Sequence, residues 1–128
     1  MHAAETPDWV RQFMDEIDTL EFGEGFANLT EETEMFFGTA HIVGAEAIKA
    51  FFVKIDEPLD VAHEVLEFWT TGEDTCFLRG EARMAKKTEP DTVVQAPFMH
   101  LFTFDDGEPR RIRTLRITAG PLRTDAVL

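Results

Sequence analysis

The sequence predicts an α+β fold, a cone-shaped barrel in which one strongly bent antiparallel β-sheet packs against three N-terminal helices. Two observations lead to this class. Three segments with helical periodicity lie before Pro58, and four long segments with strand-like composition or alternation follow it. The length of 128 residues suits a single domain, which we expect to span residues 1–128. A fold of this kind has a small cavity between its helices and the concave face of its sheet, so inward-facing residues are the first candidates for function.

The first predicted helix begins after Thr6-Pro7-Asp8, where a capping hydroxyl, a proline and an acid suit a helix start. Apolar residues then recur at helical spacing from Trp9 to Ile17. A second, short helix is expected over residues 20–27, where two glycines weaken it. The third extends from Gly44 to Ile55, and Pro58 prevents its continuation.

The predicted strands form a meander in the second half of the chain, with one further strand between the second and third helices. Alternation is clearest from Cys76 to Met84, where every second residue is apolar or small, as in a strand with one buried face. The turn at residues 71–73 joins two long strands as a hairpin. The expected strands are Thr33–Thr39, Asp60–Thr70, Asp74–Ala85, Thr92–Phe104 and Arg110–Thr118.

Composition and charge exclude several classes of function. The chain has no serine and no tyrosine, which removes a serine nucleophile and a phenolic acid. Its net charge is −13, and residues 1–64 carry 15 acids and only 3 bases, so we expect no nucleic-acid partner. No apolar run approaches the ~20 residues of a membrane span, and no basic, apolar leader opens the sequence. With a single cysteine as well, we expect a cytoplasmic protein without a membrane partner.

Several groups of residues, in their order and spacing, resemble the nuclear transport factor 2-like superfamily, especially its SnoaL-like and ketosteroid-isomerase-like members. The resemblance covers the chain from Trp9 to Ile117. It implies the cone fold, a homodimer, and a range of roles that includes isomerases, dehydratases, cyclases, epoxide hydrolases and non-catalytic transport or scaffold proteins. The residues that carry it are Trp9, Phe13 and Asp18, then Phe26-Ala27-Asn28, Phe37-Gly38, Gly44–Ile48 and Phe51-Phe52, and last Ala96–His100 before Phe104–Gly107.

The same resemblance argues against steroid isomerase chemistry. Phe13 and Phe52 occupy the positions of the two tyrosines that the isomerase branch keeps, and Met99 occupies that of its oxyanion-side aspartate. The general-base aspartate corresponds to Met35 or, with a one-residue shift, to Glu34 or Phe36. Phenylalanine and methionine supply neither a base nor a proton donor for an enolate.

Alternation and resemblance together predict an apolar inner surface. Taken singly, each of its residues suits a plain hydrophobic core, whereas the set as a lining suits an apolar or aromatic small molecule. The predicted inward residues are Phe13, Met35, Phe52, Val61, His63, Leu78, Met84, Met99 and Leu101.

His63 is the candidate general acid–base, because imidazole exchanges protons near neutral pH. Glu34 is its candidate partner, although the acidic cluster around it also suits a solvated surface. Arg116 would hold an anionic group if it faced inward, and would pair with acids across strands if it faced outward. His100 directly follows Met99, so we expect it on the opposite face. The histidines lack metal-ligand spacing, and we expect no metal or other cofactor.

These observations favour a SnoaL-like domain that binds a small hydrophobic metabolite and catalyses a proton transfer, which is an isomerisation, dehydration or cyclisation. A non-catalytic module with the same pocket is the alternative. A third interpretation is a structural protein whose cavity is filled by its own side chains and whose acidic helices contact a partner protein.

Overall fold

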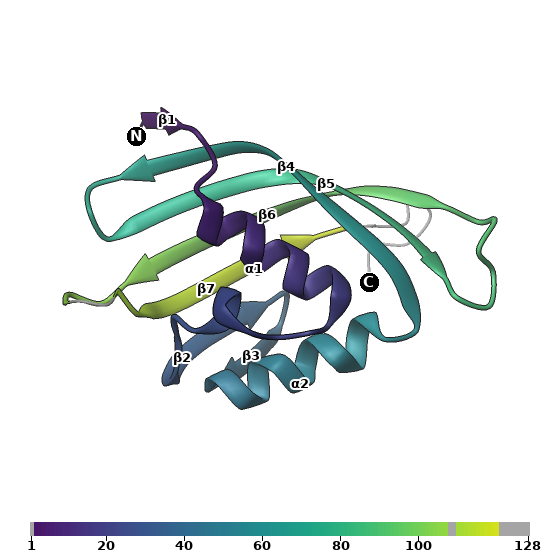
Figure 1. Ribbon diagram of the computed structural model, residues 1–128, viewed down its shortest axis with the longest axis horizontal. Coiled ribbons are helices and arrows are strands. Elements are labelled where there is room, and N and C mark those ends of the chain that lie inside the picture. Colours follow the sequence, from purple (N-terminus) through teal and green to yellow (C-terminus); the bar gives the residue numbers. More distant parts are fainter. Residues whose placement is uncertain (1, 108–109, 121–128) are drawn as a thin grey trace.

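The computed structural model describes residues 2–107 and 110–120 and contains one mixed β-sheet, two α-helices and one 3₁₀ turn (Figure 1). The helices are α1 (Asp8–Thr19) and α2 (Ala45–Asp56), and the 3₁₀ turn is η1 (Glu24–Phe26). The strands are β1 (His2–Ala4), β2 (Leu29–Phe37), β3 (Ala40–Val43), β4 (Leu59–Thr71), β5 (Thr75–Lys86), β6 (Val94–Phe104) and β7 (Ile112–Ala119).

The seven described strands lie in the order β1-β4-β5-β6-β7-β2-β3, and the sheet is open between β1 and β3. Neighbours are antiparallel except β2 and β7, which run parallel. In Figure 1, α1 crosses in front of the sheet and contacts β4, while α2 lies against β2, β3 and β4. The predicted α+β class is confirmed, as a curved open sheet with helices on its concave side.

The expected helix at residues 20–27 is a single 3₁₀ turn. Glu16 on α1 accepts the backbone N–H groups of Gly23 at 2.6 Å and Gly25 at 2.8 Å, so its carboxylate satisfies donors that a helix would use internally. Gly25 lies so close to α1 that an added Cβ would be 2.6 Å from Glu16 Oε2. Gly25 therefore marks a close approach of the loop to α1.

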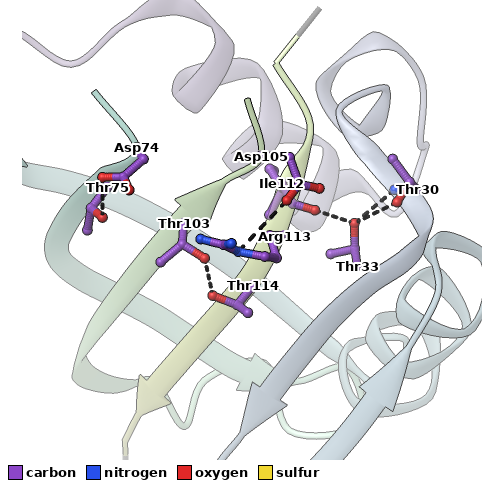
Figure 2. A network of polar contacts seen from close by, with 9 residues as sticks. All are labelled: Thr30, Thr33, Asp74, Thr75, Thr103, Asp105, Ile112, Arg113 and Thr114. Carbon is purple, nitrogen blue, oxygen red and sulfur yellow. Dashed lines mark hydrogen bonds and ion pairs between the residues drawn. The ribbon is translucent and has the colours of Figure 1, made fainter. Parts of the chain in front are cut away.

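Three features of the sheet were not expected from the sequence. β2 begins at Leu29, earlier than the predicted Thr33. Strands β1 and β3 were not predicted, because they are too short to show alternation. The parallel pairing of β2 with β7 joins residues about 80 positions apart, beyond any local pattern. Figure 2 shows how this pairing is held: buried Thr33 donates its hydroxyl to the Ile112 carbonyl at 2.5 Å, and the N–H of Thr30 donates to the same hydroxyl at 2.9 Å.

Strand β5 has the predicted alternation, with its even-numbered residues from Cys76 to Ala82 buried. Its partner β4 contains a bulge between Val65 and Glu67, opposite Gly80. A Cβ on Gly80 would lie 1.9 Å from the Glu64 carbonyl oxygen and 2.7 Å from the Phe98 ring. Any side chain at position 80 would therefore clash with the bulged strand and with the Phe98 ring, so only glycine fits there.

On β6 the predicted faces are reversed. Phe98, His100 and Phe102 are buried, whereas Met99 is 42% exposed and Leu101 lies half-buried on the outer face. Adjacent residues of a strand point to opposite sides, so predicting Met99 to face inward assigned every residue of this strand to the wrong face. His100, expected outside, is an inward residue.

Both described helices have 12 residues, and neither is long and apolar enough to cross a membrane. The core lies between these helices and the concave sheet face. Aromatic rings dominate it: Phe13 stacks on Phe26 at 4.6 Å between ring centroids and meets Phe102 edge-on at 5.6 Å.

Candidate functional site

A cavity of about 180 Å³ lies where the ends of α1 and α2 meet the concave face of the sheet. Its wall is mainly apolar, and three described residues bring titratable side chains to it. These are Asp56, His63 and His100. The apolar lining comes from Ile17, Phe37, Phe52, Ile55, Leu59, Val61, Met84, Phe98, Ile117 and Ala119.

His63 on β4 is held by Asp18, near the end of α1. One carboxylate oxygen of Asp18 accepts the ring Nδ1 of His63 at 2.5 Å, and the other accepts its backbone N–H at 3.1 Å. The two side chains are only 13% and 19% exposed, respectively, so the pair is shielded from water. Because Nδ1 is engaged by Asp18, Nε2 is the ring nitrogen left to exchange a proton.

His100 on β6 brings a second imidazole to the cavity. Its ring is packed against Phe98 at 5.4 Å, and Phe98 in turn meets the His63 ring edge-on at 4.9 Å. His100 is 3% exposed, and its Nδ1 is buried without a hydrogen-bond partner in the described part of the chain. Burial and, to a smaller extent, the nearby His63 lower the pKa of His100 to about 3, so this imidazole is neutral near pH 7.

Asp56, the last residue of α2, is the carboxyl group of the cavity wall. Burial raises its pKa to about 6. His63 opposes this rise by favouring the carboxylate, and Asp18 adds to it by repelling a second negative charge. The cavity thus combines a histidine oriented by a carboxylate, a neutral histidine, and a carboxyl group that is partly protonated near pH 6.

The predicted inward residues divide between this cavity and the closed core. Phe52, Val61, His63 and Met84 line the cavity, as expected. Phe13, Met35 and Leu78 are fully buried in the core and do not line it, so for them the plain-core interpretation holds. Met99 and Leu101 lie on the outer face of β6.

Glu34 and Arg116 belong to the outer surface. The Glu34 carboxylate accepts His41 Nε2 at 3.0 Å, and Phe36, two residues along β2, stacks on the same imidazole at 4.5 Å. The Arg116 guanidinium lies over the Phe36 ring at 4.1 Å. Glu34 therefore does not pair with His63, since Met35 is the inward residue of this part of β2. Arg116 is exposed on β7, which is the outward one of its two expected placements, so it forms no inward anion site.

Three polar residues of the site were missed in the sequence analysis: Asp18 and Asp56 were given no role, and His100 was placed outside. Asp18 follows Met14 by one helical turn on an otherwise apolar face, which was a usable signal for a buried carboxylate. Asp56 ends its helix and carries no such pattern. A larger hollow of about 670 Å³ at the far end of the sheet is walled by turn residues with exposed acids, and residues 2–107 and 110–120 contain no cluster of three or more metal-ligating side chains.

No family model and no curated protein matches this sequence. Solved structures do match its fold. One from Shewanella putrefaciens, provisionally named a SnoaL-like polyketide cyclase, is 13% identical with a TM-score of 0.72 over 90% of this chain and 91% of its own. The chain has the nuclear transport factor 2-like fold.

Two further structures extend the comparison. A protein from Sinorhizobium meliloti, provisionally named a polyketide cyclase, is 22% identical with a TM-score of 0.66, covering 89% of this chain and 96% of its own. A ketosteroid isomerase-like protein from Erwinia carotovora atroseptica is 16% identical with a TM-score of 0.64, covering 88% and 92%. At these sequence identities the comparison establishes the fold alone, so the function has to be argued from the cavity.

Proposed function

We propose that this protein is a cofactor-free proton-transfer enzyme that acts on a small hydrophobic carbonyl compound, as an isomerase, dehydratase or cyclase. The observation that carries the proposal is the Asp18–His63 pair at the wall of an apolar cavity. A carboxylate on Nδ1 fixes the tautomer of the ring and stabilises the imidazolium that forms when Nε2 takes a proton. The names of the Shewanella and Erwinia structures point to the same class of chemistry.

In this proposal, His63 Nε2 removes a proton from the carbon beside the substrate carbonyl. The neutral imidazole of His100 donates an N–H to the carbonyl oxygen as negative charge develops there. The apolar wall around Phe52, Val61 and Phe98 excludes water and holds the hydrocarbon part of the substrate.

The cavity also limits substrate size. An apolar cavity of roughly 150 Å³ holds a benzene-sized molecule, so 180 Å³ suits a compound with one ring. We therefore propose a substrate of that size in place of a polycyclic one.

The test is exchange of the α-hydrogens of cyclohexanone for deuterium in D₂O, followed by mass spectrometry. The protein should accelerate exchange over buffer, and His63→Gln should lower the enzymatic rate roughly 10²–10⁴-fold, the usual contribution of a general base. His41→Gln is the matched control, since His41 also bonds a carboxylate but lies on the outer surface.

NMR shifts of the Phe98 and His100 ring protons report binding independently of exchange. If cyclohexanone shifts these signals and no exchange occurs, the result supports the alternative of a non-catalytic ligand-binding module. If neither shifts nor exchange occur with cyclohexanone, cyclohex-3-en-1-one or acetophenone, the proposed substrate class is wrong.

A homodimer is the assembly that the resemblance implies, and the outer sheet face offers a surface for it. Met99 and Leu66 are 42% and 46% exposed there, beside the Arg79–Glu67 ion pair at 2.9 Å. Sedimentation velocity should show a dimer that Met99→Glu converts to monomer. A wild-type monomer at high micromolar concentration would contradict this part of the proposal.

A further inference from the structure

Asp56 brings a carboxyl group into the same cavity as the Asp18–His63 pair, and the reaction proposed above leaves it without a task. It ends α2, where the carbonyl end of the helix dipole disfavours a negative charge. Within residues 2–107 and 110–120, no hydrogen bond or ion pair joins its carboxyl to another side chain. This half-buried carboxyl lines the cavity, so it can form hydrogen bonds with a molecule bound there.

The groups that face Asp56 come from three elements. Asp18 on α1 repels a negative charge at this position, and His63 on β4 attracts one. His100 on β6 lines the same cavity and is neutral. No lysine or arginine is among the described lining residues, so only the weaker attraction of His63 opposes the loss of water around a carboxylate. Burial raises the pKa of Asp56 to about 6, so its protonated form, an O–H donor, persists to a higher pH than in an exposed aspartate.

We propose that Asp56 is the catalytic acid that protonates a departing oxygen, and that the enzyme eliminates water from a β-hydroxy carbonyl compound with one ring. This inference rests on the proposed function, because it takes His63 as the base. A ring-sized molecule that fills a cavity of about 180 Å³ touches the walls carrying both groups. An isomerisation needs one base that returns its own proton, whereas elimination of water needs a base and a separate acid together.

The step balances without a further reactant. His63 Nε2 takes the α-hydrogen as a proton, and the electrons of that C–H bond form the C=C bond. The bond from the β-carbon to its hydroxyl breaks, and the Asp56 proton joins the leaving oxygen to give water. An α,β-unsaturated carbonyl remains, and the proton on His63 returns to Asp56 through solvent, which restores both groups.

Two probes separate the acid from the base. Deuterium exchange of cyclohexanone needs the base but not the acid Asp56. Conversion of 3-hydroxycyclohexanone to cyclohex-2-en-1-one, followed by ultraviolet absorbance, needs both. Asp56→Asn should lower the ratio of dehydration rate to exchange rate at least tenfold. Glu57→Gln, at the exposed next residue, is the control and should leave the ratio unchanged.

The pH profile is a second readout that a purely structural role would not produce. In the wild type, kcat/KM for dehydration should fall as pH rises through about 6, where Asp56 loses its proton, and Asp56→Asn should lack this fall. Exchange without dehydration in the wild type would overturn the role of Asp56 and leave the proposed function standing. Absence of both reactions would refute the proposed function itself. An equal loss of both rates in Asp56→Asn, with an unchanged pH profile, would show that Asp56 only supports the cavity.

Discussion

Asp18→Asn is the sharpest perturbation of the site, because it preserves the shape of the side chain and removes its charge. In the wild type, both carboxylate oxygens accept hydrogen bonds from His63, at 2.5 Å from the ring and 3.1 Å from the backbone. Asparagine has a single oxygen, so one of the two N–H donors of His63 must face an NH₂ group. A hydrogen bond to a charged group contributes about 1.5–3 kcal/mol, and we expect a loss of about 2 kcal/mol in the free energy of unfolding.

Urea unfolding at pH 7, followed by the fluorescence of Trp9 and Trp69, measures this loss. Glu34→Gln is the matched control, because its bond to His41 is more exposed, at 43% and 48%, and such pairs contribute about 0–1 kcal/mol. The same Asp18→Asn variant should lose deuterium exchange of cyclohexanone roughly 10²-fold or more, since Nδ1 of His63 is no longer held.

A double-mutant cycle with His63→Gln isolates the pair itself. We expect a coupling of about 1–2 kcal/mol between the two positions, within the range for residues in direct contact. A stability loss below about 0.5 kcal/mol with no measurable coupling, together with unchanged exchange, would refute the argument that Asp18 orients His63.

Three further predictions concern the frame of the site. Asp56→Asn should raise the urea midpoint at pH 8 more than at pH 5. Burial raises the folded pKa of Asp56 to about 6, so the stability that the protonated side chain provides at low pH is lost as the pH rises through 6. Equal effects of the substitution at both pH values would contradict this. Gly80→Ala should destabilise by about 2 kcal/mol or more, since its Cβ would overlap the Glu64 carbonyl and the Phe98 ring, and an unchanged urea midpoint would show that the bulge yields without cost. Glu16→Gln should lower the free energy of unfolding by about 2 kcal/mol, because it loses one of the two hydrogen bonds that Glu16 accepts from backbone N–H groups of the following loop. Glu24→Gln, on the same loop, should lower it by less than about 0.5 kcal/mol.

Much of the fold could be predicted from local patterns. The amphipathic spacing from Trp9 to Ile17 and the stop at Pro58 fixed both α-helices to within a residue or two. The alternation of β5 gave its buried face correctly. The parallel pairing of β2 with β7 could not be predicted from local patterns, because it joins residues about 80 positions apart, as does the hydrogen bond from the Thr33 hydroxyl to the Ile112 carbonyl.

The site was harder to predict because its parts come from four separate elements. His63 could be chosen from its strand face, but its partner is 45 positions earlier in the chain, and no local spacing links them. The predicted partner, Glu34, is adjacent to the inward Met35 on β2, so its side chain points to the opposite face of the sheet. On β6 an error of one residue in the predicted alternation put Met99 inside and His100 outside. In the structure His100 is buried and Met99 is exposed.

The absence of tyrosine and serine narrows the chemistry of the cavity once its lining is known. Phe52 brings an apolar ring and no hydroxyl to the cavity, and Phe13 is buried in the core against Phe26. The wall that the structure describes therefore offers proton transfer through imidazole and carboxyl groups alone. In the proposed reaction His63 is the base, the neutral His100 donates to an oxygen, and Asp56 gives up a proton. An elimination requires a base, an oxygen donor and an acid, so the dehydration we propose gives a task to each of the three titratable side chains of this wall.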